Sequence, residues 1–148
     1  MKEYRELQKE AASPDADIQL SPVDGNLNNW RGFVQGPAGT PFAKGRFELE
    51  IIVPSSYPLA PPNIRFSTKI FHPNVHPKTG EICLDILKNA WSPAWTLQAT
   101  CRAIIILLSC PEPDSPLNCD AGNLLRSGDI RGFRSLAVMY TRLYAVGA

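Results

Sequence analysis

The sequence predicts an α+β fold in which a four-stranded antiparallel sheet precedes a set of helices. Its first half contains four short strand-like segments, separated by turns that are rich in glycine and proline. From residue 96 onward, apolar residues recur at helical spacing instead. The chain has 148 residues, which is close to the usual size of one domain. It shows neither an internal repeat nor a linker, so we expect a single domain over residues 1–148.

A short helix is expected to come before the sheet. Residues 2–12 have an apolar face with charged pairs outside it, which is typical of an amphipathic helix, and Ser13-Pro14 would end it. Four strands are then expected at about residues 18–22, 30–36, 46–53 and 63–67. The turns between them are short, and strands joined by short turns pair antiparallel with their neighbours in sequence. The sequence therefore predicts a meander.

The second half predicts three helices. The first is expected to begin after Thr96, which is suited to an N-cap, and to end before Pro111 and Pro113. Its apolar positions are Leu97, Cys101, Ile104, Ile105 and Leu108. Residues 121–126 and 130–145 predict two further helices. The apolar face of the last one is formed by Leu136, Met139, Tyr140 and Leu143.

Composition excludes several classes of function. The net charge is +1 and the charges are interspersed, so the chain lacks the basic stripe of a nucleic-acid-binding protein. Its longest apolar run, Ala103–Leu108, is far shorter than the ~20 residues that span a bilayer. Met1–Glu6 is charged and lacks the apolar region of a secretory signal. We therefore expect a soluble, cytosol-facing protein that binds no nucleic acid.

Three of the four cysteines are expected to serve the structure. In a reducing compartment free thiols are expected, and the spacing of Cys101, Cys110 and Cys119 contains no CxxC pair that would indicate zinc. Cys101 lies on the apolar face of its helix, where it would pack as a small hydrophobic residue. Cys110 and Cys119 flank a proline-rich loop and are also expected to be structural. The sequence leaves a redox role for them open.

The fourth cysteine, Cys83, lies in an irregular stretch from residue 74 to 96. A long irregular segment inside a compact domain is usually functional. Gly80 is expected to supply a positive-φ turn that brings Cys83 to the surface. Trp91 and Trp95, farther along this stretch, are expected to be packing anchors.

The chemistry of this thiol depends on its neighbours. A hydrolase thiol normally needs a histidine or another basic residue to form the thiolate. The chain has two histidines, His72 and His76, and neither has an obvious orienting partner, which disfavours a protease-type dyad. A thiol that receives an already activated acyl group needs no strong base. Asn74 then either donates a hydrogen bond to the developing oxyanion or braces its own loop; both roles stay open.

Five segments follow one another along the chain. They are GPAGTPF (36–42), YPLAPP (57–62), HPN (72–74), GEICLDIL (80–87) and WSPAWTL (91–97). In this order they resemble the motifs of the ubiquitin-conjugating enzymes, the E2 family, and the resemblance covers nearly all 148 residues. Residues 54–58 and 114–129 are more specifically similar to the peroxisomal branch of that family.

The resemblance implies the E2 (UBC) fold and a carrier reaction at Cys83. An activating enzyme would transfer ubiquitin to this thiol as a C-terminal thioester, with Asn74 stabilising the oxyanion or holding the loop. Asp85 would lie beside the approach of the acceptor. Where many members carry an aspartate that favours an incoming lysine, this chain has Ser115, preceded by Asp114. A hydroxyl cannot attract an amine as a carboxylate does, so we expect a cysteine acceptor as well as lysine.

The resemblance also implies two docking surfaces. RING-type ligases would bind at Leu59, Pro93 and Ala94. The activating enzyme would bind the N-terminal helix at Lys2, Arg5 and Lys9, although these basic residues could equally form an ordinary solvated face.

Ubiquitin and the activating enzyme are partners that the E2 resemblance itself implies. The peroxisomal resemblance adds a membrane-anchored peroxisomal binding protein, RING-type ligases at that membrane, and the import receptor as substrate. The enzyme would act at the cytosolic face of the peroxisomal membrane. No cofactor is expected to be bound, because ATP and Mg are used by the activating enzyme. The alternatives are a general cytosolic E2 of another pathway, a non-catalytic E2-like binding module, and a cysteine hydrolase on a different fold.

Overall fold

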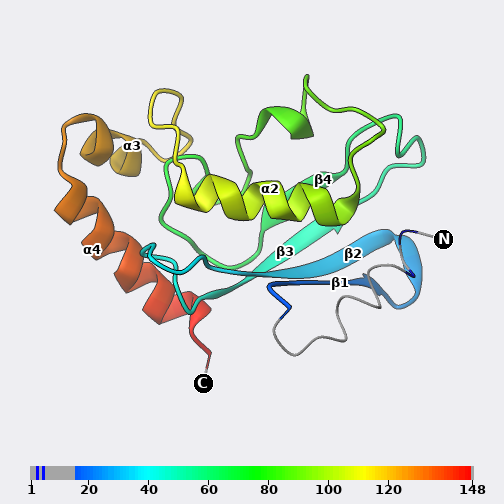
Figure 1. Ribbon diagram of the computed structural model, residues 1–148, viewed down its shortest axis with the longest axis horizontal. Helices are drawn as coiled ribbons and strands as arrows, with labels where there is room; N and C mark the ends of the chain where they lie inside the picture. Colours follow the sequence, from blue (N-terminus) through cyan, green and yellow to red (C-terminus); the bar gives the residue numbers. More distant parts are fainter. Residues whose placement is uncertain (1–2, 4, 6–15, 148) are drawn as a thin grey trace.

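The computed structural model describes Glu3, Arg5 and residues 16–147. Its centre is an antiparallel sheet with the strand order β1-β2-β3-β4 (Figure 1). The strands are β1 (Ile18–Val23), β2 (Asn26–Gln35), β3 (Arg46–Ile52) and β4 (Asn63–Phe66). The predicted meander is therefore confirmed. Glu3 and Arg5 are helical, and the rest of the helix predicted over residues 2–12 lies outside the described residues.

Strand β2 begins four residues earlier than predicted because the β1–β2 hairpin turns within two residues. Asp24 and Gly25 both have positive φ, at 52° and 74°, as a type I′ turn requires. Val23 pairs with Asn26 directly across this turn. Residues 26–29 are mostly asparagine, which is rare in strands, so the sequence concealed this part of β2.

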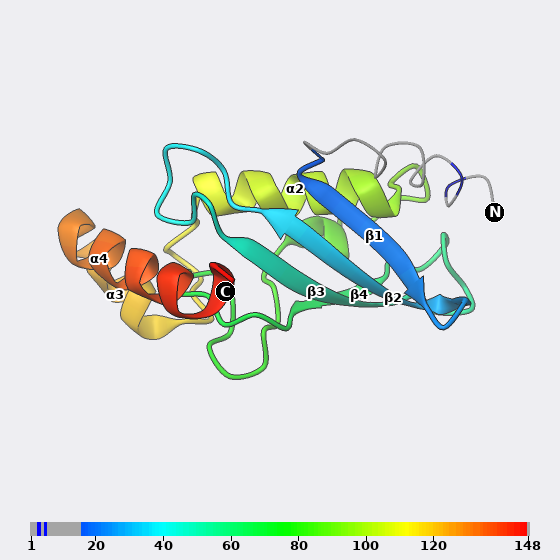
Figure 2. The ribbon, with the colours of Figure 1, turned by 90° about the horizontal axis from the view of Figure 1, so that it is seen from below.

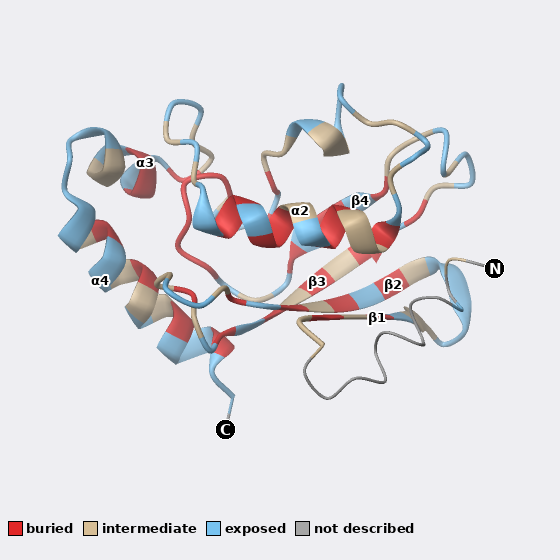
Figure 3. Cartoon of the chain, viewed as in Figure 1, coloured by how far each residue is buried: buried red, intermediate tan, exposed pale blue. Residues whose placement is uncertain are grey.

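The sheet has one face against the core and one face in contact with solvent (Figure 3). On β3, Phe47, Leu49 and Ile51 are fully buried. The alternate residues Glu48 and Glu50 form ion pairs with arginines on the other face. This alternation follows from the two-residue period of a strand.

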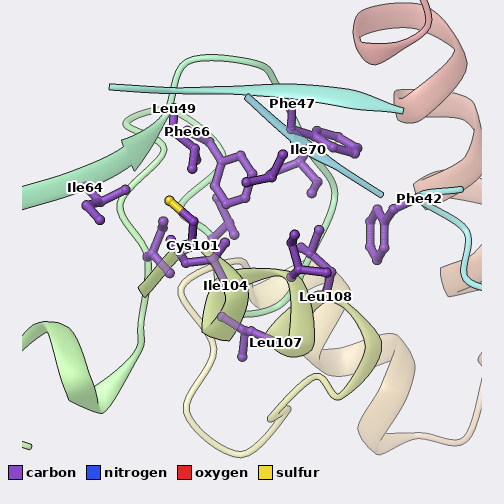
Figure 4. Close-up of a cluster of buried hydrophobic side chains, with 14 of the residues drawn as sticks. Phe42, Phe47, Leu49, Ile64, Phe66, Ile70, Cys101, Ile104, Leu107 and Leu108 are labelled. Atoms are coloured by element: carbon purple, nitrogen blue, oxygen red, sulfur yellow. The ribbon is translucent and has the colours of Figure 1, made fainter. Parts of the chain in front are cut away.

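Helix α2 (Leu97–Ser109) lies across the buried face of the sheet (Figures 1 and 2). It begins as predicted, because Thr96 Oγ1 accepts a hydrogen bond from the Ala99 N–H at 3.0 Å. Figure 4 shows Cys101 and Ile104 of α2 among the apolar side chains of the strands. The helix and the sheet thus form one core, on which the loops that follow β4 and α2 rest.

The last two helices lie beyond one end of the sheet (Figure 2). Helix α3 (Cys119–Arg126) begins two residues earlier than predicted because the Asn118 side chain caps it, accepting from the Ala121 N–H at 3.1 Å. Helix α4 (Ile130–Tyr140) continues into the π-helical turn η2 (Thr141–Ala145).

The predicted apolar face of the last helix was partly wrong. Leu136 and Tyr140 are half-buried, but Met139 and Leu143 are exposed. The buried stripe is Phe133, Ala137, Thr141 and Ala145. The helix packs its Phe133 ring on Phe71, with centroids 6.0 Å apart. Most side chains on this stripe are small, which lets the helix approach the core closely. The prediction chose the larger apolar residues and therefore missed the buried face.

Candidate active site

The site rests on a buried segment over residues 70–75. Its His72 donates from Nε2 to the Leu107 carbonyl oxygen of α2 at 3.0 Å and accepts at Nδ1 from the Asn74 N–H at 3.0 Å. Burial lowers the pKa of His72 to about 4, so the ring is neutral at physiological pH. Both ring nitrogens are engaged with the backbone. His72 is therefore a structural residue and cannot serve as the base of a thiol.

Asn74 connects this segment to two other loops. Its Nδ2 donates to the Glu112 carbonyl oxygen at 2.8 Å, and its Oδ1 accepts from the Glu112 N–H at 2.8 Å. Its own carbonyl oxygen accepts from the Cys83 N–H at 2.8 Å. The carboxamide is only 1% exposed. In this structure Asn74 braces the loop, while Nδ2 carries a second N–H besides the one that bonds Glu112.

Gly80 directs the chain back toward Asn74. Its φ is +77°, and a Cβ would lie 2.0 Å from the Phe66 carbonyl oxygen, so only glycine fits. The Phe66 N–H donates to the Gly80 carbonyl oxygen at 2.9 Å, and Val75 and Ile82 form an isolated β-bridge. The expected positive-φ turn is present. It brings Cys83 beside the buried segment by fixed backbone hydrogen bonds.

The four thiols have different environments. Cys83 is half-buried and free. Cys101 is fully buried, and desolvation raises its pKa to about 12, which makes it inert as the prediction of a packed hydrophobic residue requires. Cys110 and Cys119 are exposed and free, so neither fills a core position. The expectation that these two are structural is not supported by their exposure.

The second histidine also lacks the arrangement of a catalytic dyad. His76 Nδ1 accepts from the N–H groups of Lys78 and Thr79 at 3.1 and 3.2 Å, which closes the turn before Gly80. Together with the sealed ring of His72, this argues against a histidine-activated hydrolase.

Two loops hold the residues predicted at the approach of an acceptor. Asp85 is exposed and opens the short 3-10 helix η1 (Asp85–Leu87), two residues after Cys83. Asp114 and Ser115 are exposed on the loop between α2 and α3. That loop is tied to the buried segment, because the N–H groups of residues 117 and 118 donate to the Pro73 carbonyl oxygen at 2.8 and 3.1 Å.

The residues predicted to dock a ligase lie on two loops that the structure joins. Leu59 is 78% exposed, and Pro93 and Ala94 are exposed as well. Between them, the Trp91 indole Nε1–H donates to the Pro58 carbonyl oxygen at 2.9 Å. Trp91 thus anchors the loops to each other and leaves three small or apolar side chains uncovered.

Only one of the residues predicted to dock the activating enzyme can be placed. Arg5 is exposed. Lys2 and Lys9 lie outside the described residues.

Sequence reasoning missed two residues that hold the site. Glu112 contributes its backbone alone, so its side-chain type carries no signal. Glu3 accepts from the hydroxyl of Tyr57 and from the N–H of Leu97, a residue 94 positions away. No local pattern relates residues so far apart.

The described part of the chain, Glu3, Arg5 and residues 16–147, contains no group of three histidine, cysteine, aspartate or glutamate side chains that could hold a metal ion. No helix in it is long and apolar enough to cross a bilayer.

A family model and two relatives with similar sequences point to the same protein family. The sequence model described as ubiquitin-conjugating enzyme matches residues 1–140. Protein PEROXIN-4 of Arabidopsis thaliana is 66% identical over 145 residues, which cover 98% of this chain and 92% of that protein. Ubiquitin-conjugating enzyme E2 pex4 of Dictyostelium discoideum is 61% identical over 145 residues, covering 97% and 95%.

A solved structure shows the same fold. It is the crystal structure of the H. polymorpha ubiquitin conjugating enzyme Pex4p in complex with the soluble domain of Pex22p. Its enzyme chain superposes with a TM-score of 0.93 at 39% identity, and the match covers 99% of this chain and 96% of that one.

We predict that acid destabilises the protein through His72. The ring has a pKa of about 4 when folded and about 6.5 when unfolded, so the unfolded state binds more protons between these values. The free energy of unfolding should therefore fall by about 2 kcal/mol between pH 7.5 and pH 5 from this group alone. Urea unfolding at both pH values measures the difference. The fall in the free energy of unfolding between the two pH values should be smaller in His72→Gln and unchanged in His76→Gln. An equal fall in both variants would contradict the assignment to His72.

We predict that Asn74→Ala lowers the free energy of unfolding by about 2 kcal/mol, because it leaves the Glu112 N–H and carbonyl oxygen without partners. Urea unfolding measures this loss, and Asn63→Ala, at an exposed position of β4, should change stability by no more than about 0.5 kcal/mol.

The same variant separates the two roles of Asn74 when thioester discharge is measured under conditions where it is folded. A rate within twofold of the unmodified protein indicates bracing alone. A loss on the order of a hundredfold indicates an oxyanion donor.

Proposed function

The chain belongs to the ubiquitin-conjugating enzyme family and is an E2 enzyme, and from this premise we propose that Cys83 carries ubiquitin as a thioester. The observation that carries the proposal is the hydrogen bond from the Cys83 N–H to the Asn74 carbonyl oxygen. It ties the backbone of a half-buried, free cysteine to that of Asn74, whose side chain is buried. Such a site presents a nucleophile in a fixed place and offers it no histidine base.

The proposed reaction consists of two acyl transfers. Cys83 sulfur attacks the thioester carbonyl of ubiquitin on the activating enzyme, the new C–S bond forms, and the thiol of that enzyme leaves. An acceptor nucleophile then attacks the same carbonyl carbon, and Cys83 leaves as thiolate while the acceptor loses its proton. Thiolate is a good leaving group in both steps, so no strong base is required.

Asn74 has a place in both steps. Negative charge develops on the carbonyl oxygen, where an N–H donor stabilises it. One N–H of Nδ2 bonds Glu112 in this structure, and the second is the group that would serve the oxyanion. The bracing role and the oxyanion role use different hydrogen atoms, so the bond to Glu112 does not use up the donor that the oxyanion would need.

The acceptor side of the site is open. Asp85, Asp114 and Ser115 are all exposed, on the loops that follow Cys83 and α2. The Ser115 hydroxyl carries no charge, so it gives an amine no electrostatic advantage over a thiol. We therefore propose that cysteine serves as an acceptor as well as lysine.

The docking surfaces fit this scheme. We assign a RING-type ligase to Leu59, Pro93 and Ala94, which lie on the loops that Trp91 joins. Exposed apolar side chains that gather on one surface are a feature of protein–protein interaction sites. The activating enzyme is assigned to the N-terminal segment with Lys2, Arg5 and Lys9.

The pathway assignment rests on relatives. Two of them are named as a peroxin or a pex4 enzyme at 61–66% identity, and a third was crystallised with the soluble domain of a second protein, Pex22p. These relatives support a role for this chain at the cytosolic face of the peroxisomal membrane, held there by a membrane-anchored partner. The import receptor is the proposed substrate.

We predict that the carrier thiol is Cys83 alone. The protein is incubated with ubiquitin, activating enzyme and Mg-ATP, and the products are separated with and without reductant. The unmodified protein should form a reductant-labile adduct, and Cys83→Ser a reductant-stable oxygen ester. Cys110→Ser, which removes an exposed thiol, should keep the labile adduct. Absence of any adduct from the unmodified protein would contradict the proposed function.

We predict that Ser115→Asp shifts the choice of acceptor toward lysine. The charged enzyme is offered free lysine and free cysteine at equal concentration, and the two discharge rates are compared. The ratio of lysine to cysteine discharge should rise several-fold in the variant, because the new carboxylate attracts the amine. Ser127→Asp, at an exposed position after α3, should leave the ratio unchanged. A strong preference of the unmodified enzyme for lysine would refute the cysteine acceptor.

A further inference from the structure

The Glu3 carboxylate joins two parts of the chain that are distant in sequence. The Tyr57 hydroxyl donates to its Oε2 at 3.0 Å and lies 3.3 Å from its Oε1. The N–H of Leu97, at the start of α2, donates to Oε1 as well. One side chain from the N-terminal segment thus bonds both the 54–62 loop and the first turn of α2.

Tyr57 transmits this connection to the loop that presents Leu59. Its ring packs on the Trp91 ring, with centroids 6.0 Å apart. Trp91 in turn bonds the Pro58 carbonyl oxygen, and the Leu59 N–H donates to the Ser56 carbonyl oxygen at 2.8 Å. These contacts form a continuous series from Glu3 to Leu59.

The contacts at Glu3 are of the stronger kind. A carboxylate that accepts from a hydroxyl forms a charge-assisted hydrogen bond. The N–H groups at the start of a helix also favour a negative charge. Burial, and after it the Glu3 charge, raise the pKa of Tyr57 above its ordinary value, so its hydroxyl stays a donor throughout the neutral range.

Leu59 itself supplies little to hold its position. Its side chain is 78% exposed, so packing does not fix it. Its place depends on the backbone of the 54–62 loop, and that backbone is held by the contacts of Tyr57 and Trp91. Loss of Glu3 removes the carboxylate to which the Tyr57 hydroxyl donates.

We propose that Glu3 is a positioning residue for the ligase-binding surface, which it fixes through Tyr57. The ligase part of this inference rests on the proposed function. Glu3 contacts neither the thiol nor the acceptor side among the hydrogen bonds of the described residues. Its removal therefore weakens the binding of a ligase and leaves the chemistry of the thioester intact.

The first test needs no ligase. Hydrogen exchange of the Leu59 amide and of the Trp91 indole N–H is followed by NMR in the full chain, for the unmodified protein, Glu3→Ala, Glu3→Gln and Tyr57→Phe. Exchange at both groups should rise several-fold in Glu3→Ala and Tyr57→Phe. Glu3→Gln keeps one acceptor oxygen and should give an intermediate value. Exchange of the Ile51 amide, in the core, should be the same in all of these variants. The matched variant Glu50→Gln should leave exchange at Leu59 and Trp91 unchanged.

The second test measures the ligase surface. A RING domain chosen because it accelerates discharge of the unmodified thioester is titrated against each variant. The RING-domain concentration that gives half-maximal acceleration should rise several-fold in Glu3→Ala and in Tyr57→Phe. The double variant should show no larger rise than either single variant, since both substitutions remove the same contact. The rate at saturation and the unassisted discharge rate should be unchanged.

The outcomes distinguish this inference from the proposed function. Unchanged exchange at Leu59 and Trp91 in Glu3→Ala overturns the positioning role, whatever the titration gives. Additive effects in the double variant overturn the route through Tyr57. If Leu59→Ala leaves the half-saturating concentration unchanged, the ligase surface of the proposed function fails, and with it the link from Glu3 to ligase binding.

Discussion

The two hydrogen bonds between the Asn74 carboxamide and the Glu112 backbone are the constraint on which the site depends. They join the buried segment before the thiol to the loop after α2. Because Asn74 also accepts the N–H of Cys83, three loops meet at one residue. Polar groups buried in this way must stay paired, since an unpaired one costs about 1–3 kcal/mol. Breaking these hydrogen bonds would leave polar groups unpaired, so the three loops stay together. The thiol takes its position from backbone atoms of the surrounding loops.

Under the proposed function, the arrangement explains how Cys83 can act without a base. His72 lies two residues before Asn74, yet burial keeps it neutral and both of its nitrogens bond the backbone. A hydrolase would need that ring free to take a proton. An E2 receives its acyl group already activated, so the fold can use histidine as a structural part. The proposed reaction then requires the site to place one sulfur and one carboxamide.

The sheet and α2 give the loops a rigid base, and the loops differ in how they are held. The thiol loop is held by glycine geometry at Gly80 and by backbone bonds. The outer loops, which carry Leu59 and Ala94, are joined by the Trp91 indole and connected to the N-terminal segment through Tyr57. Leu59, the proposed docking residue, can thus keep its position without being buried, because the backbone beneath it is held by side chains from other segments.

The features that depend on local rules could be predicted from the amino-acid sequence. The strand order, the Thr96 cap, the turn at Gly80 and the membership of the E2 family all follow from short-range spacing and motifs, and each agrees with the structure or the comparisons. The three-dimensional fold was needed to show the buried face of α4, the exposure of Cys110 and Cys119, and the partners of Asn74 and Glu3. These depend on contacts between residues as many as 94 positions apart, and on backbone atoms that every residue type shares, so no local pattern records them.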